Sequence, residues 1–173
     1  MDKIEIIVYS LPIMFMLHDF EEIIGLKTWF DKNGEWLDEK FPMLTKHLQS
    51  LRHLSVQAFV VAVWEEYLII SIVTLTALTF QWYDAWIIIF MAYSFHIIIH
   101  IIQWIIVRRY IPMIITSLLS IPYIIWGINN IVCSFTAIKI GGYLIAGIFI
   151  GVLNLLFAYK LAYKFDKYMN NKL

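Results

Sequence analysis

Three groups of ionisable side chains interrupt otherwise apolar stretches of this sequence. They are the run His18-Asp19-Phe20-Glu21-Glu22, the pair Glu65-Glu66, and the pair His96 and His100. Ionisable groups are expensive inside a membrane span, and those that occur there commonly serve proton transfer or ion binding. Each group is therefore a candidate for chemistry of this kind.

Helical spacing brings the members of two of these groups onto single faces. Residues three and four apart lie side by side on a helix, so His18 is expected beside Glu21 and Glu22. His96 and His100 are four residues apart, which is the spacing of helical two-histidine metal sites. Both spacings are therefore suited to binding a metal ion.

Helical spacing does not place the remaining acidic residues on the same faces. They are Asp19, Glu65 and Glu66. Adjacent helical residues diverge by about 100°, so only one of Glu65 and Glu66 is expected to point fully inward. Asp19 is expected to point away from the His18 face, toward a cytoplasmic group or a neighbouring helix.

The composition indicates that these groups lie in a membrane protein. Of the 173 residues, 61% are hydrophobic and 15% are charged, whereas soluble domains average about 25% charged residues. The formal net charge is zero, which gives no reason to expect a nucleic acid partner. The single cysteine, Cys133, cannot form a disulfide within the chain.

Five stretches are long and apolar enough to cross a bilayer, which takes about 20 residues. They predict an all-α, polytopic transmembrane bundle that forms a single membrane domain over residues 1–173. The N-terminal stretch shows no small-residue cleavage site, so the first span is expected to be retained. The spans are expected at residues 4–26, 54–79, 85–107, 110–132 and 141–163.

Residues 27–53 form the extended polar region between the first two spans. Asn33-Gly34 predicts a turn within it. Around and beyond Pro42, apolar residues share one helical stripe, which predicts an amphipathic segment lying on the cytoplasmic face of the membrane. This stripe consists of Leu37, Phe41, Leu44, Leu48 and Leu51.

Glycines on the last span suit close helix packing. Gly147 and Gly151 are four residues apart, a pattern of small residues that favours the close approach of two membrane helices. The partner helix is expected either in the same chain or in a second copy. The sequence leaves the oligomeric state open.

The basic residues define the orientation of the spans. With the N-terminus outside, all of the 13 lysines and arginines except Lys3 and Lys139 fall on the cytoplasmic side. This distribution follows the positive-inside rule and supports an odd number of spans. The C-terminus is therefore expected in the cytoplasm, in a multi-pass protein of the plasma membrane.

This orientation places the three ionisable groups at similar depths. With a rise of about 1.5 Å per residue, they lie roughly 6 to 18 Å from the cytoplasmic ends of their spans. They are therefore expected to meet in one layer of the membrane. The expected metal ligands are His18, Glu22, Glu65, His96 and His100, with Glu21 and Glu66 as catalytic residues.

A metal ion would neutralise such a layer. No lysine or arginine is expected at the same depth, so the carboxylates need protons, histidines or a cation. Histidine and glutamate together suit zinc, iron or manganese, whereas structural zinc sites usually include cysteine. The sequence therefore predicts one or two divalent ions, and zinc and iron both remain open.

Each group also has a simpler interpretation. Glu22 lies near the end of its span and can face water there. Glu65 and Glu66 can be kept neutral by burial, and His96 and His100 can hydrogen-bond to neighbouring helices. The agreement in depth argues against all three interpretations holding together.

Two motifs resemble those of a known family. His18-Asp19-Phe20-Glu21-Glu22 matches an H-x-x-E-E signature, and Tyr110-Ile111-Pro112 resembles a Y-x-P-G motif, with Met113 in place of the glycine. The chain thus resembles the HXXEE-domain family of small bacterial and archaeal integral membrane proteins. The resemblance implies a further site histidine, for which His100 is favoured over His96. It implies no activity, because the family is uncharacterised.

The sequence favours an intramembrane metalloenzyme that acts on a lipid or another apolar molecule entering sideways from the surrounding membrane lipids. Zinc would indicate hydrolysis, and a di-iron centre would indicate hydroxylation or desaturation. Without a metal, a glutamate and a histidine would act as general acid and base. The alternatives are a transporter of ions, metals or protons, and a non-catalytic module in which the polar cluster holds the bundle together.

Overall fold

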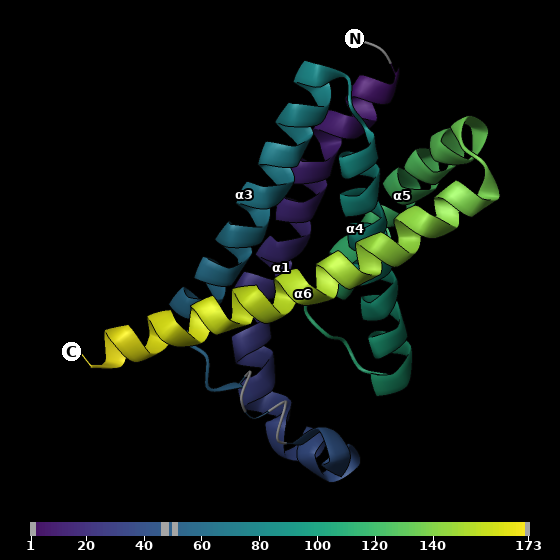
Figure 1. Cartoon of the computed structure of the whole chain (residues 1–173). Helices are drawn as coiled ribbons and strands as arrows, with labels where there is room; N and C mark the ends of the chain where they lie inside the picture. Colours follow the sequence, from purple (N-terminus) through teal and green to yellow (C-terminus); the bar gives the residue numbers. More distant parts are fainter. Residues whose placement is uncertain (1–2, 46–48, 50–51, 172–173) are drawn as a thin grey trace.

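The computed structural model describes residues 3–45, 49 and 52–171, and every regular element in this part of the chain is a helix (Figure 1). The predicted all-α class is therefore confirmed. The helices are α1 (Lys3–Lys40), the 3-10 helix η1 (Pro42–Leu44), α3 (Val56–Phe80), α4 (Asp84–Val107), α5 (Ile114–Ser134) and α6 (Ala137–Asn170).

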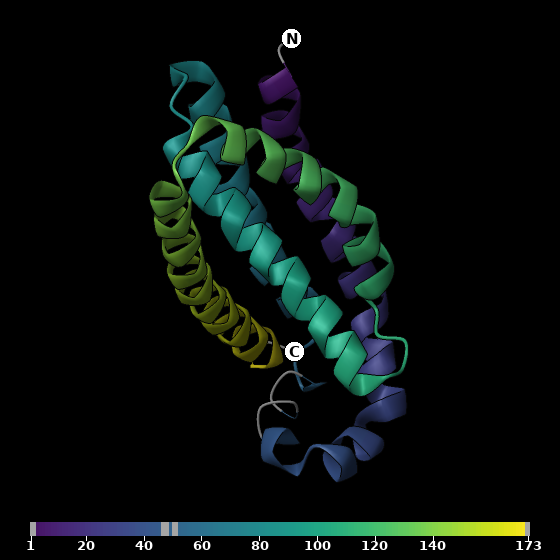
Figure 2. The same cartoon turned by 90° about the vertical axis from the view of Figure 1, so that its right-hand side faces the viewer.

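The long helices alternate in direction and pack side by side. α6 crosses α3 and α4 diagonally and packs against both of them (Figure 1). α4 lies between α5 and α6 in Figure 2, and α1 packs against α3 and α5. Apolar side chains of α1 and α4 fill the centre, among them Leu11, Phe90 and Ile97.

Short connections with recognisable caps reverse the chain between helices. α3 begins after Ser55, whose Oγ accepts a hydrogen bond from the Ala58 N–H at 3.1 Å. α3 and α4 end at Gln81 and Arg108, which adopt left-handed φ angles of 53° and 55°. A left-handed residue is a common end for a helix, because it turns the chain away from the helix axis.

Four helices of the described part, α3, α4, α5 and α6, are long and apolar enough to cross a membrane. They correspond to the last four predicted spans, although α5 begins at Ile114 and α6 extends over Ala137–Asn170. α1 contains the first predicted span but is not among the four, and its apolar half carries Asp19, Glu21 and Glu22. The chain is therefore a helical membrane protein with four apolar candidate spans.

The first half of α1 has two contrasting faces. One face is buried in the bundle and carries apolar residues followed by the ionisable group: Ile7, Val8, Leu11, Phe15, His18, Asp19 and Glu22. The opposite face exposes large apolar side chains at helical spacing: Ile6, Tyr9, Ile13, Leu17, Phe20 and Ile24. His18, Asp19 and Glu22 therefore lie on the same face of α1 as its buried apolar residues and point into the bundle.

The predicted turn at Asn33-Gly34 is wrong, because α1 continues without interruption to Lys40. Asn33 donates its side-chain amide to the Trp29 carbonyl within the helix at 2.9 Å. A Cβ at Gly34 would lie 2.5 Å from Nη1 of Arg52, so the absence of a side chain admits the guanidinium. Arg52 in turn pairs with Asp38 at 2.5 Å and, through its hydrogen bonds, holds the pKa of Asp38 below its usual range.

Two residues of the predicted amphipathic segment, Leu48 and Leu51, lie outside the described residues, as do residues 46, 47 and 50. Directly after α1 the chain forms the 3-10 turn Pro42–Leu44. In Figure 1 this turn follows the end of α1 that projects beyond the bundle.

Gly147 and Gly151 pack α6 against α4 of the same chain. A Cβ at Gly147 would lie 2.6 Å from the Ile88 carbonyl oxygen and 3.0 Å from the Ala92 nitrogen. A Cβ at Gly151 would lie 3.3 Å from the Ala92 Cβ. The glycine pattern is therefore used for packing within the chain.

This close contact predicts that Gly147→Ala destabilises the protein. The added methyl group meets backbone rather than a flexible side chain, and overpacking of this kind costs about 1–3 kcal/mol. Gly141→Ala is the matched control on the same helix, since a Cβ there meets nothing within 4 Å. It should be neutral or gain up to about 1 kcal/mol from helix propensity. Thermal unfolding of both variants in detergent tests this, and equal stabilities would contradict the packing.

Candidate metal centre

Two helices supply four side chains that converge inside the bundle. α1 supplies His18 and Glu22, and α4 supplies His96 and His100, each pair one helical turn apart. His18 is fully buried, and Glu22 and His100 are each 8% exposed. One possible ligand atom from each residue lies within 4.8 Å of all the others, so the group can hold a metal ion.

Three of the distances between these atoms are close to those between the ligands of a single ion. Oε1 of Glu22 lies 3.1 Å from Nε2 of His100 and 3.5 Å from Nε2 of His18. Nε2 of His96 lies 2.8 Å from Nε2 of His100. Ligand atoms bound to one tetrahedral zinc at 2.0–2.1 Å are about 3.4 Å apart. Only small side-chain shifts would therefore bring all four to an ion.

Hydrogen bonds on the far side of two rings set their tautomers. Nδ1 of His100 lies 3.0 Å from Oε1 of Gln103, which only accepts, so the histidine donates there. Nδ1 of His18 lies 3.1 Å from Oγ1 of Thr116. That hydroxyl donates to Glu21 at 2.6 Å and therefore accepts from His18. Each neutral ring then directs the lone pair of Nε2 into the cluster, where that of His100 accepts a hydrogen bond from Nε2–H of His96 at 2.8 Å. A metal ion would replace this proton, and hydrogen bonds at Nδ1 are a common way of holding metal-binding histidines.

The cluster contains buried atoms that the protein itself does not satisfy. Nε2 of His18 and Oε1 of Glu22 are buried, and neither has a hydrogen-bond partner among the described residues. Both are acceptors when His18 is neutral and Glu22 is ionised, so their mutual approach at 3.5 Å is unfavourable. A cation between them would remove that conflict.

Glu21 lies beside the cluster rather than in it. Its carboxylate accepts hydrogen bonds from the Thr116 backbone N–H at 2.8 Å and from the Tyr110 hydroxyl at 3.0 Å. These contacts lie at the start of α5, where Met113 is the N-cap residue and has no side-chain oxygen with which to cap the helix. Glu21 thus caps α5 from another helix, and it reaches His18 only through Thr116.

In the loop before α5, Tyr110 and Pro112 of the Y-x-P motif both contact α1. Tyr110 binds Glu21, and Pro112 packs so closely on Gly25 that a Cβ at Gly25 would lie 2.5 Å from the proline Cβ. Met113 follows with a φ of 151°, a conformation that glycine adopts readily and other residues rarely do. The departure from the family glycine is therefore accommodated with backbone strain at Met113.

Glu65 and Glu66 occupy different positions on α3, outside the four-residue cluster. Glu65 accepts a hydrogen bond from the Asn154 side chain of α6 at 3.4 Å. Glu66 lines a cavity together with His96 and is close enough to interact electrostatically with Glu22. Of this pair, Glu66 is the carboxylate that faces the cluster side of the bundle.

Three residues near the cluster were not predicted as part of a site. Asp19 is only 3% exposed and lies within electrostatic range of Glu22 and Glu66. Gln103 could have been found from its position three residues after His100. Thr116 could not, because it lies 98 residues from His18 in the sequence.

An apolar cavity of about 300 Å³ adjoins the cluster where α6 crosses α3 and α4. Its walls are mostly isoleucine, leucine, valine and small residues, and His96 belongs to both the cavity and the cluster. Other polar side chains on its wall include Glu66, Asn154 and Tyr93, and the Tyr93 hydroxyl is already bound to Ser120 at 2.8 Å. An apolar molecule in this cavity would thus reach the histidine side of the cluster.

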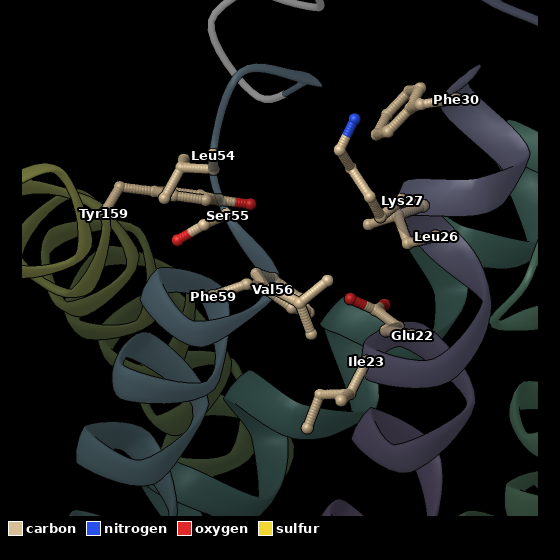
Figure 3. A pocket seen from close by; sticks show the side chains of 10 residues that line it. All are labelled: Glu22, Ile23, Leu26, Lys27, Phe30, Leu54, Ser55, Val56, Phe59 and Tyr159. Carbon is tan, nitrogen blue, oxygen red and sulfur yellow. The ribbon is translucent and has the colours of Figure 1, made fainter. Parts of the chain in front are cut away.

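A second, smaller cavity of about 40 Å³ reaches Glu22 from another direction (Figure 3). Glu22 lies between Ile23 and the amino group of Lys27 in this view, and Ser55 and Tyr159 line the opposite wall. A water molecule needs about 10–15 Å³ of such space, so a few waters fit. Glu22 is therefore reachable by water on a side that the larger cavity does not share.

The fold and the cluster together define a helical membrane protein with a buried histidine–glutamate site on two adjacent helices. A family model described as "Protein of unknown function with HXXEE motif" matches residues 9–127, more than half of the chain, and the protein belongs to this family. The matched range includes all four residues of the cluster. No curated protein and no solved structure matches the chain.

Proposed function

We propose that this protein is an intramembrane metalloenzyme that binds a divalent ion, zinc or iron, through His18, Glu22, His96 and His100. The observation that carries the proposal is the convergence of histidine Nε2 atoms and a carboxylate oxygen at 2.8–3.5 Å, with two of them buried and unpartnered. The adjoining apolar cavity supports a lipid or another apolar molecule as substrate.

We also propose that α1 is a fifth span. Its exposed apolar stripe from Ile6 to Ile24 covers about 27 Å at 1.5 Å per residue, close to the roughly 30 Å of hydrocarbon in a bilayer. Its ionisable residues face the bundle, as expected for such residues in membrane helices. The charge distribution then supports an outside N-terminus and a cytoplasmic C-terminus. The proposed location is the plasma membrane of a bacterial cell.

The donor set is compatible with more than one reaction class. A bound ion would supply Lewis acidity and a site for water or dioxygen, zinc favouring hydrolysis and iron favouring oxidation. Glu66 lines the cavity beside His96 and is the best-placed group to exchange a proton with a molecule bound there. Glu21, through Thr116, holds His18 in orientation.

Transport is the less favoured function. The apolar cavity continues from the cluster along residues such as Ile88 and Gly147, and a path for ions needs polar groups along its length. Metal or proton flux in proteoliposomes would be required to support transport instead.

Elemental analysis of gently purified protein tests the proposal. Wild type is expected to carry about one equivalent of zinc or iron, and His96→Ala/His100→Ala is expected to carry almost none, because two of four ligands are lost. His53→Ala is the control, since His53 is an exposed histidine outside the cluster. Absence of stoichiometric metal from wild type, after growth with both metals, would overturn the proposal.

A further inference from the structure

The polar groups of the apolar cavity are gathered at one end. On α4 the lining runs from Ile88 to Ile99, with His96 near its cluster end, and on α6 it runs from Gly147 to Leu155, with Asn154 near that end. From His96 to Ile88 is eight residues, or about 12 Å along the helix. The cavity is therefore elongated, with an apolar far end and a polar end beside the cluster.

The polar end carries carboxyl groups and hydrogen-bonding capacity. Glu66 interacts electrostatically with Glu65 and Glu22, so three carboxylates act on this end. The Asn154 side chain contacts Glu65 at 3.4 Å and also interacts with Glu66. Among the described residues, no lysine or arginine lines the cavity. An anionic head group would therefore meet the carboxyl groups of Glu65 and Glu66 with no basic side chain to pair with, and Glu22 already offsets part of the charge of the proposed metal ion.

We propose that this cavity binds the single aliphatic chain of a neutral lipid, such as a long-chain alcohol, and excludes anionic lipids. The chain lies along Ile88, Ile89 and Gly147, and the hydroxyl group donates to Glu66 or accepts from Asn154 beside His96. A volume of about 300 Å³ is at the lower end of the range for ligand pockets, which suits one chain rather than a phospholipid with two. This inference rests on the proposed function, because it names the class of substrate delivered to that site.

Photolabelling distinguishes this inference from the metal proposal. The probes are a medium-chain alcohol and the matching carboxylic acid at alkaline pH, each with a diazirine at the end of the chain. The alcohol is expected to label residues at the far end of the cavity roughly tenfold or more above the acid, since burying a carboxylate beside Glu65 and Glu66 without a basic side chain is unfavourable. Labels confined to outward-facing residues, or equal labelling by both probes, would overturn the inference.

A matched pair of variants on α6 provides the control. Ile148 lines the cavity, whereas Ile145 is exposed on the outer surface. Ile148→Trp is expected to reduce labelling by the alcohol about tenfold, and Ile145→Trp is expected to leave it unchanged. Metal content is measured on the same samples: bound metal without selective labelling contradicts this inference alone, whereas missing metal in wild type contradicts the proposed function. A normal metal content of Ile148→Trp shows that the variant is folded.

Discussion

Glu22→Gln is expected to abolish metal binding and to leave the protein folded. Glutamine keeps the size of the side chain, removes the negative charge, and adds N–H donors that a carboxylate lacks. Those donors can satisfy Nε2 of His18 and of His100, which lie 3.5 and 3.1 Å from Oε1 of Glu22. Hydrogen bonds would thus replace the ion. Losing a residue that only hydrogen-bonds to a metal ligand lowers metal affinity by about 10- to 100-fold, so losing the ligand itself should lower it by more than about 100-fold.

Thermal unfolding with and without a chelator measures this effect. Metal at a thousand times its dissociation constant adds about 4 kcal/mol to stability, so chelation should lower the melting temperature of wild type clearly. It should not change that of Glu22→Gln. Glu65→Gln is the matched control, because it makes the same chemical change on α3 outside the four-residue cluster.

The alternative outcomes have separate meanings. A Glu22→Gln protein that fails to fold at any metal concentration would indicate that the cluster mainly holds the bundle together. A variant that keeps its full complement of metal would show that Glu22 is not a ligand. In either case the metalloenzyme proposal would have to be revised.

The four residues of the cluster could be predicted because their helices are regular. The spacing of four residues between His18 and Glu22, and between His96 and His100, places each pair on one face. The depth of each pair follows from the rise per residue and the distribution of basic residues. Glu65, the fifth predicted ligand, differs because adjacent residues on a helix diverge, and spacing could not decide between it and Glu66.

The contacts made by Glu21 could not be predicted in the same way. They depend on how α5 sits against α1, and Thr116 and Tyr110 are separated from Glu21 by 95 and 89 residues. The predicted turn at Gly34 failed for a similar reason. A distant side chain, Arg52, occupies the space beside that glycine, and local turn preference does not report such a contact.

The two cavities reach the cluster from different sides and suit different molecules. The larger, apolar one meets His96, and the smaller one meets Glu22 near Lys27 and Ser55. A membrane-dissolved molecule and water would thus approach one site from two sides. This arrangement fits an enzyme whose apolar substrate and water have to meet, and it fits a purely structural cluster poorly.

Thr116→Val is expected to weaken metal binding without removing any ligand. Valine has the shape of threonine but neither accepts from Nδ1 of His18 nor donates to Glu21, so the chain of hydrogen bonds from His18 to Glu21 is cut. The ring of His18 is then free to rotate or to change tautomer, and its Nε2 lone pair is no longer held toward Glu22. Losing an outer partner of this kind costs about 10- to 100-fold in metal affinity.

The comparison with Thr116→Ser separates this effect from a general loss of stability. Serine keeps the hydroxyl group, so it should keep the metal affinity within about threefold, which is under 1 kcal/mol. Both variants keep the backbone N–H that donates to Glu21 at 2.8 Å, and α5 stays capped in each. Thr79→Val controls for the substitution itself, because the Thr79 hydroxyl donates locally, to the Leu75 carbonyl at 2.8 Å. Competition with a metal-binding dye measures the affinities, and equal values for the valine and serine variants would show that Thr116 does not orient His18.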